Sequence, residues 1–253
     1  YLYNNSLTPI ETDSALGAAG YIKVGDLDGD TINDILVLSE TTGVNYIHKG
    51  NTAGGYSQPI RINEANLYAD PNNTQIEIAD INNDGLNDLL ATNGEYIRTL
   101  INMSTSWTEG VAISPRRQIY SFLCKNLDSD SPPEIAISNS ALDEIVILKN
   151  PDFQITSTIS TTYKPDLLAS GDLNGDGLED LITASKTNSK VSVFINNGNN
   201  QFTELASYTV GIGPDILEVG DINADCKLDV ITANKTSKNI TVLAGNGNGT
   251  LQN

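Results

Sequence analysis

Residues 172–180 read DLNGDGLED, and the apolar run LITA follows them directly. A carboxylate or amide side chain stands at the first, third, fifth and ninth positions of this stretch, which are Asp172, Asn174, Asp176 and Asp180, and Gly177 stands at the sixth. Alternate side chains of a tight turn can point inward together, and oxygen ligands are those that Ca²⁺ prefers. The stretch therefore predicts a loop that wraps a hard cation.

The same pattern occurs five times in the 253 residues. Its first position falls at Asp26, Asp80, Asn126, Asp172 and Asp221, so successive copies begin 54, 46, 46 and 49 residues apart. We number these loops one to five in chain order; they span residues 26–34, 80–88, 126–134, 172–180 and 221–229. A period in this range is typical of one four-stranded blade of a β-propeller or a comparable unit.

The residues around loop four predict four strands, at 167–169, 181–184, 190–196 and 202–210. The third of these alternates Val191, Val193 and Ile195 with polar neighbours, as an amphipathic strand does. Apolar residues at helical spacing with caps occur nowhere in the sequence. The fold class expected is therefore all-β, a single β-propeller domain over residues 1–253 built from four-stranded antiparallel blades.

The two ends of the sequence leave the number of blades open. Residues 1–6 match the end of a third strand and residues 7–12 match the place of a fourth, whereas the last copy has a third strand at 239–244 and little sequence beyond it. A five-bladed ring could close if the N-terminal strand completed the last blade, which would remove exposed strand edges. The alternative is a segment of a six- or seven-bladed ring.

Charge and composition exclude several classes of partner. The chain has 32 acidic and 14 basic residues, a formal net charge of −18, so it lacks the basic footprint that nucleic acid requires. Sixteen of the acidic residues stand at positions one, three, five and nine of the loops, so the charge is concentrated there. The sequence contains no run of about 18 apolar residues, so it does not predict membrane insertion. Cys124 and Cys226 lie in different repeats, and we expect two free thiols.

Three segments, GDLNGDGLEDLITA, GDINADCKLDVITAN and VLAGNGNGTL, resemble the FG-GAP and VCBS repeats of integrin α-chain heads and bacterial surface proteins. The resemblance covers nearly the whole chain. It implies a β-propeller in which the loop between the first two strands of each blade binds Ca²⁺, up to five ions in all. It also implies a secreted or cell-surface module for adhesion, lectin-like binding or assembly, with an extracellular protein or glycan, or further copies of itself, as partner.

The expected calcium ligands are the side chains at positions one, three, five and nine and the backbone carbonyl at position seven. They are Asp26, Asp28, Asp30, Ile32 and Asp34; Asp80, Asn82, Asp84, Leu86 and Asp88; Asn126, Asp128, Asp130, Pro132 and Glu134; Asp172, Asn174, Asp176, Leu178 and Asp180; and Asp221, Asn223, Asp225, Lys227 and Asp229. An EF-hand is excluded because it needs a Glu at position twelve and flanking helices. The remaining alternative is an acidic turn held by side-chain hydrogen bonds to its own backbone, without an ion.

The five loops differ in quality. Loops two and four keep glycine at position six, where a left-handed backbone is least costly, and are the strongest candidates. Thr31 and Cys226 occupy position six in loops one and five, which could alter their geometry. Loop three has Asn126 in place of an acid at position one and Ser131 at position six, and is the weakest.

Residues for catalysis are scarce, so the chain is not expected to be an enzyme and no catalytic or cofactor-binding residue is assigned. His48 is the only histidine, and Arg116 and Arg117 are the only adjacent arginines. A polysaccharide-acting or phytase-like propeller enzyme is one alternative, and a purely structural repeat of a filament or large adhesin is another. Among the aromatic residues, Trp107 in the polar segment STSWTEG is the best candidate for a ligand contact.

Overall fold

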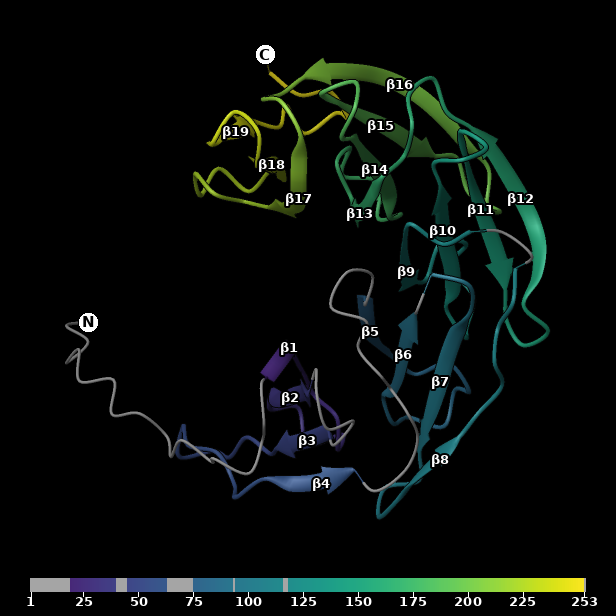
Figure 1. Cartoon of the computed structure of the whole chain (residues 1–253), viewed down its shortest axis with the longest axis vertical. Helices are drawn as coiled ribbons and strands as arrows, with labels where there is room; N and C mark the ends of the chain where they lie inside the picture. Colours follow the sequence, from purple (N-terminus) through teal and green to yellow (C-terminus); the bar gives the residue numbers. More distant parts are fainter. Residues whose placement is uncertain (1–18, 40–44, 63–74, 93, 116–117, 253) are drawn as a thin grey trace.

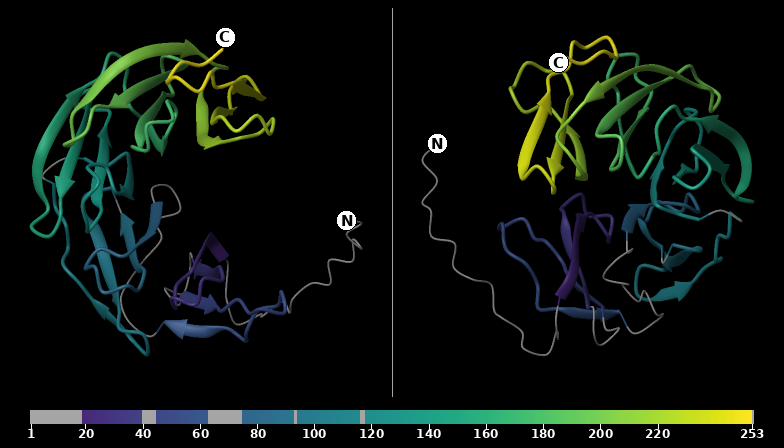
Figure 2. Two further views of the ribbon diagram at one scale, coloured as in Figure 1. Left: turned by 180° about the vertical axis from the view of Figure 1, so that it is seen from behind. Right: turned by 45° about the horizontal axis from the view of Figure 1, so that its top comes forward.

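The computed structural model describes residues 19–39, 45–62, 75–92, 94–115 and 118–252. This part of the chain is all-β and forms a five-bladed β-propeller, as the repeat predicts. Figure 1 shows the five sheets following one another around a common centre, and Figure 2 shows the same curved series from behind and from a tilted direction. The strands in each sheet are antiparallel and follow in chain order.

Each of the first four blades has four strands. Blade one contains β1 (Ala19–Gly25), β2 (Asp34–Ser39), β3 (Asn45–His48) and β4 (Ile60–Ile62). Blade two contains β5 (Gln75–Ala79), β6 (Asp88–Thr92), β7 (Ile97–Asn102) and β8 (Trp107–Glu109). Blade three contains β9 (Ser121–Lys125), β10 (Glu134–Asn139), β11 (Glu144–Lys149) and β12 (Gln154–Ser160). Blade four contains β13 (Leu167–Gly171), β14 (Asp180–Ser185), β15 (Lys190–Asn196) and β16 (Phe202–Thr209).

Blade five has three strands within the described residues. They are β17 (Pro214–Gly220), β18 (Asp229–Asn234) and β19 (Asn239–Leu243). The N-terminal segment at 1–12, which the sequence offers as the missing fourth strand, lies outside the described residues. The first strands of consecutive blades face the centre and contact one another, β1 with β5, β5 with β9, β9 with β13 and β13 with β17.

The hydrophobic core is divided among the interfaces between blades. Four buried clusters are present, and each draws its residues from two consecutive blades. In the cluster between blades two and three, for example, Leu90 from β6 packs with Phe122 from β9 and Ile135 from β10. Every residue of β6, β10 and β14 is buried, because these second strands are covered on both faces. The blades are therefore held together mainly by apolar packing against their neighbours.

The outer faces of the first and last blades remain exposed. Ile22 and Val24 of β1 are 66% and 53% exposed, and Ile240 and Val242 of β19 are 68% and 54% exposed. These apolar side chains sit where the core of a further interface would begin. No helix in the described part of the chain is long and apolar enough to cross a bilayer.

Candidate metal centre

All five acidic loops occupy the same place in their blades. Each joins the first strand to the second, and in each the residue before position one pairs with position nine across the two strands. The paired residues are Gly25 and Asp34, Ala79 and Asp88, Lys125 and Glu134, Gly171 and Asp180, and Gly220 and Asp229. Strands therefore flank every loop, which agrees with the exclusion of an EF-hand, and one backbone frame presents five variants of the same side-chain set.

The carboxylate at position nine is buried and anchors the loop to the sheet. The side chains of Asp34, Asp88 and Asp180 are fully buried. In all five loops one oxygen of this carboxylate accepts a hydrogen bond from the backbone N–H of position two, at 2.8–3.1 Å. In loops one, two, four and five the other oxygen accepts an N–H just beyond the third strand or at its last residue, at 2.8–2.9 Å. Position nine thus joins three segments of its blade.

Burial perturbs the acidity of these anchors. Loss of solvent raises the pKa of Asp88 and of Asp180 to about 6, against the lowering effect of the backbone hydrogen bonds, and it raises the pKa of Asp34 in the same direction. The carboxylates at positions one and five of the same loops also raise the pKa values of Asp88 and Asp180. A nearby cation would favour the charged form and oppose these effects.

The carboxylate at position one organises the turn. In loops one, two, four and five one of its oxygens accepts the N–H of position six at 2.8–2.9 Å. Position six is left-handed in all four, with φ of 71° at Thr31, 88° at Gly85, 86° at Gly177 and 64° at Cys226. Thr31 and Cys226 therefore do not change the backbone conformation at position six. Both residues adopt the left-handed conformation of the glycines, at the cost of backbone strain.

A second left-handed position was missed by the sequence reasoning. Position four has φ between 60° and 79° in every loop, at Gly29, Asn83, Ser129, Gly175 and Ala224. Glycine in two copies and asparagine in a third are the signal that could have revealed it, since these residues tolerate the left-handed region best. The loop is thus bent twice, at positions four and six.

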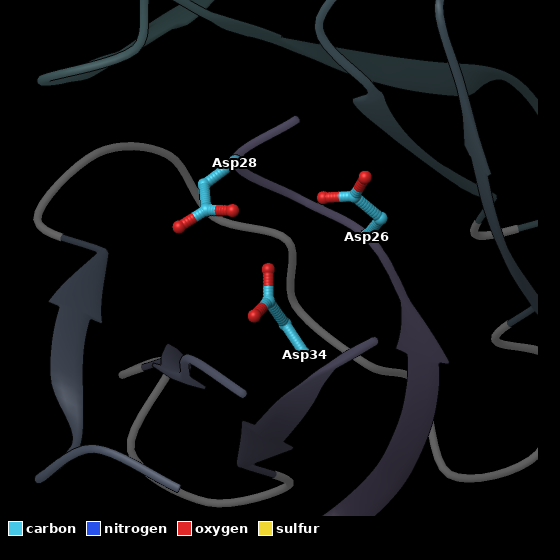
Figure 3. Close-up of side chains that lie close together, drawn as sticks. All are labelled: Asp26, Asp28 and Asp34. Atoms are coloured by element: carbon cyan, nitrogen blue, oxygen red, sulfur yellow. The ribbon is translucent and has the colours of Figure 1, made fainter. Parts of the chain in front are cut away.

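Loop one brings three carboxylates to one point. Ligand oxygens of Asp26, Asp28 and Asp34 all lie within 4.8 Å of one another, and Figure 3 shows the three carboxylates turned toward a common space. In loops two and four the side chains at positions three and five meet directly, because Asn82 donates to Asp84 at 3.0 Å and Asn174 donates to Asp176 at 2.9 Å.

The hydrogen bonds expected of an acidic turn without an ion are also present. The N–H of position seven donates to the position-five carboxylate in loops one, two, four and five, at 2.8–3.0 Å. These contacts do not exclude a metal, because each carboxylate oxygen can accept more than one partner. The donor set of these four loops is entirely oxygen and carries three or four negative charges, which fits Ca²⁺. Positions one, three, five and nine, with the carbonyl of position seven, are the groups that would hold the ion.

Loop three departs from this arrangement. The Asn126 side-chain carbonyl accepts the N–H of Ser129 at 2.7 Å, and its amide donates to the backbone carbonyl of Asp130 at 2.5 Å. Pro132 at position seven has no N–H, so the bond to position five is lost. The second oxygen of Glu134 is buried and has no hydrogen-bond donor among the described residues. Its expected ligands Asp128, Asp130 and Glu134 nevertheless converge within 4.8 Å.

Buried asparagines connect each loop to the following blade, a feature that the sequence reasoning also missed. The Asn102 amide donates to the carbonyl of Leu27 at 2.5 Å, the Asn150 amide to that of Ile81 at 2.5 Å, and the Asn196 amide to that of Leu127 at 2.8 Å. The three acceptors are position two of loops one, two and three. In blade five, where Gly245 replaces the asparagine, the N–H of Gly249 donates to Leu173 at 2.9 Å instead. We call Asn102, Asn150 and Asn196 the latch asparagines.

The structure places the remaining candidate residues as follows. Trp107 lines a cleft of about 530 Å³ between blades one and two, together with Ile60, Arg61 and Lys49. His48 lies at the end of β3 with its Nδ1 3.3 Å from the carbonyl of Ser57.

Both cysteines are free thiols, as predicted, and only Cys226 is exposed. Burial raises the pKa of the Cys124 thiol. Arg116 and Arg117 lie outside the described residues.

Several solved structures share this architecture. An Agrocybe aegerita lectin that recognises non-reducing terminal N-acetylglucosamine is 17% identical, with a TM-score of 0.63 over 92% of this chain and 64% of the lectin chain. BBS1N, solved in complex with ARL6DN, is 16% identical, with a TM-score of 0.61 over 93% of this chain and 68% of its own. A Bacteroides uniformis protein named as a candidate 6-phosphogluconolactonase is 14% identical, with a TM-score of 0.59 over 94% and 70%.

At these identities the likeness shows the fold alone, and this chain spans about two thirds of the length of each structure. No curated protein matches the chain. The model of the FG-GAP-like repeat matches residues 26–91 and 172–232, just over half of the sequence, and includes loops one, two, four and five. With its blades and its loops in the places that this repeat requires, the chain belongs to the FG-GAP-like repeat family.

Proposed function

We propose that this chain is an extracellular binding module, a β-propeller that Ca²⁺ stabilises and that binds a protein or glycan. The observation that carries the calcium part is the crowding of carboxylates in loops two, four and five. Among the described residues, no lysine or arginine forms an ion pair with any of these three loops. Like charges held together in this way repel one another, and a divalent cation relieves that repulsion while adding its binding free energy to folding.

The extracellular part of the proposal follows from the affinity range of such sites. Calcium sites in extracellular modules often bind with dissociation constants of about 10⁻⁴–10⁻³ M, so millimolar Ca²⁺ occupies about half or more of them. A propeller stabilised by such sites is most stable outside the cell. Family membership and the acidic surface support the same location.

Thermal unfolding with and without Ca²⁺ tests the metal assignment. At a concentration 100-fold above the dissociation constant each occupied site contributes about 2.7 kcal/mol, which corresponds to ~5–10 °C in Tm for a domain of this size. We expect Asp84→Ala and Asp176→Ala each to remove one such increment. Asp152→Ala, which removes an exposed carboxylate outside the loops, is the matched control. If the two loop variants retained the full calcium-dependent rise, the loops would not be the metal sites.

For the ligand, the cleft between blades one and two is the candidate site. Trp107 contributes an indole ring, and Arg61, Thr105 and Ser106 contribute polar groups to the same walls. An aromatic surface beside several hydrogen-bonding groups suits a glycan or an amphipathic segment of a protein. The cleft volume of about 530 Å³ lies within the range of small-molecule sites.

Binding of Trp107→Ala to a glycan array and to extracellular protein extracts tests this site. The matched control is Tyr120→Ala, because Tyr120 is an exposed aromatic residue of another blade and is outside the cleft. We expect the Trp107 variant to lose at least tenfold in affinity for any ligand that the wild type binds. Because Trp107 also packs against the core between blades one and two, binding is compared well below the Tm of both variants. Equal loss in both variants, or in neither, would remove the cleft from the proposal.

Assembly is a second candidate function, and the exposed apolar faces at the two ends of the blade series favour it. Ile216, Ile240 and Val242 lie on the free face of blade five, and Ile22 and Val24 are exposed on blade one. If copies of the chain pack through these faces, Ile240→Glu should reduce the mass measured by light scattering to that of a monomer. Leu142→Glu, at an exposed turn of blade three, should not. A monomeric wild type at all concentrations would refute assembly by the isolated chain.

We propose no catalytic role. The enzymatic alternative, cleavage of uronic-acid polysaccharides or hydrolysis of phytate, is tested by incubation with those substrates. Turnover that is lost in the Arg116→Ala/Arg117→Ala double variant would replace our proposal.

A further inference from the structure

One register position decides which charge faces each acidic loop. It is the residue on the third strand, or just beyond it, that stands opposite position nine. In blade three, Leu148 pairs with Ile135, so the next residue, Lys149, lies opposite Glu134. The same register gives Lys49 in blade one and an apolar residue in the other blades, which are Ile101, Ile195 and Ala244.

The Lys149 ammonium lies among the carboxylates of loop three. Its Nζ forms a short ion pair with Asp128, lies 2.9 Å from a carboxylate oxygen of Asp130 and lies 3.9 Å from the buried Oε1 of Glu134. Lysine is charged at neutral pH at its ordinary pKa, and the Lys149 ammonium donates hydrogen bonds to the carboxylates of Asp128 and Asp130. Asp128 is held from a second side by the Asn200 amide at 2.9 Å, which comes from blade four. One positive group thus contacts the acids at positions three, five and nine.

The unpaired oxygen of Glu134 explains why the lysine fits in this blade. In the other four loops that oxygen of position nine accepts a backbone N–H from the end of the third strand. Glutamate is one methylene longer than aspartate, and its Oε1 has no donor among the described residues, with Lys149 3.9 Å away. A buried carboxylate oxygen without a partner is costly, and a nearby ammonium lowers that cost.

We propose that the Lys149 ammonium is the resident cation of loop three and takes the place that Ca²⁺ takes in the other loops. This inference rests on the proposed calcium-binding function. An ion bound by Asp128, Asp130 and Glu134 would have to share their oxygens with the ammonium, and two cations at such separation repel strongly. Loop three therefore stays folded without metal, whereas loops two, four and five depend on it.

Loop one provides an internal comparison. Lys49 stands at the equivalent position, but within the described residues its ammonium pairs with Asp28 alone, at 2.9 Å. Loop one also has one more carboxylate than loop three, and Asp26, Asp28 and Asp34 still converge. Lys49 neutralises one of the ligands, but the space between the three carboxylates stays available to an ion. Loop one therefore binds Ca²⁺ more weakly than it would without Lys49.

Counting bound calcium by native mass spectrometry of the full chain tests the proposal. Asp130→Ala should leave the number of bound ions unchanged, whereas Asp176→Ala, the same position in loop four, should lower it by one. Lys149→Met should raise the number by one, and Lys149→Arg should not. Ala244→Lys, which places an ammonium opposite position nine of loop five, should lower it by one. Lys235→Met is the control for the change in charge, because Lys235 is 80% exposed and lies in the turn between β18 and β19.

Stability in EDTA is the second measurement. Lys149→Met should lower Tm in EDTA and regain part of the loss when Ca²⁺ is added, while Lys149→Arg should behave as wild type. A drop of one ion in Asp130→Ala, or an unchanged count in Lys149→Met together with an unchanged Tm in EDTA, would overturn the proposal. If the wild type bound no calcium, the proposed function would fail, but the loss of Tm in EDTA would still report whether Lys149 neutralises loop three.

Discussion

The latch asparagine of blade four offers the sharpest test of how the blades are held together. In the Asn196→Ala variant the backbone carbonyls of Leu127 and Glu179 lose the donor that Asn196 now supplies at 2.8 and 3.0 Å. The N–H of Gly198 loses its acceptor, the Asn196 side-chain carbonyl, at 2.9 Å. The Asn196 side chain is only 1% exposed, so water cannot replace these partners without a rearrangement.

The expected loss can be worked from these contacts. Three hydrogen bonds at about 1 kcal/mol each give ~3 kcal/mol of unfolding free energy. For a domain of this size that corresponds to a fall in Tm of ~6–12 °C. Because Asn196 provides no calcium ligand, the fall should be the same in EDTA and in saturating Ca²⁺.

The neighbouring residue supplies the control. The Asn197 amide donates to the Thr203 hydroxyl at 2.9 Å in an exposed position, so Asn197→Ala should cost less than about 1 kcal/mol. Thermal unfolding followed by circular dichroism measures the Tm of both variants under identical conditions. A difference of less than about 1 °C between them would refute the idea that the latch asparagines join neighbouring blades energetically.

Three further outcomes follow from the loops and the thiols. In EDTA, the free energy of unfolding should fall as pH rises from about 4 to about 6. Burial raises the pKa of Asp88 and of Asp180 to about 6, so over this interval the folded state keeps protons that the unfolded chain has already released. A Tm that increases over this interval would contradict the prediction. Thr31→Gly and Cys226→Gly should each stabilise the protein by about 1 kcal/mol, since both residues are left-handed, and urea titration would show a loss instead if the side chains contributed packing. Iodoacetamide should modify Cys226 in the folded protein and Cys124 only after unfolding, as peptide mass spectrometry can establish, because Cys124 is buried.

The architecture could be predicted from the sequence because it rests on local, repeated features. The strand predicted at 190–196 is β15, and the strand predicted at 202–210 is β16 with one residue fewer. Turn residues and apolar alternation act over a few residues, and five copies of the same signal reinforce one another. The two free cysteines could be anticipated for a similar reason, since they lie in different repeats.

The remaining features depend on contacts between distant residues. The latch asparagines meet carbonyls 69 or 75 residues away, and nothing in their own surroundings distinguishes them from other asparagines. Lys149 faces loop three only because β11 pairs with β10 in one register, and a shift of one residue would turn it away. Loop three could be ranked weakest from its missing acid and glycine, but the lysine that neutralises it could not be found from spacing alone.

The direction of the latches bears on how the chain folds during synthesis. The backbone carbonyl at position two of loops one to four accepts its hydrogen bond from a residue of the following blade. The donors are, in order, the amides of Asn102, Asn150 and Asn196 and the N–H of Gly249. Each blade that leaves the ribosome therefore lacks a hydrogen-bond partner until most of its successor has followed. Because the N-terminal part of a chain is made first, these inter-blade hydrogen bonds can form during synthesis only in the order of the blades.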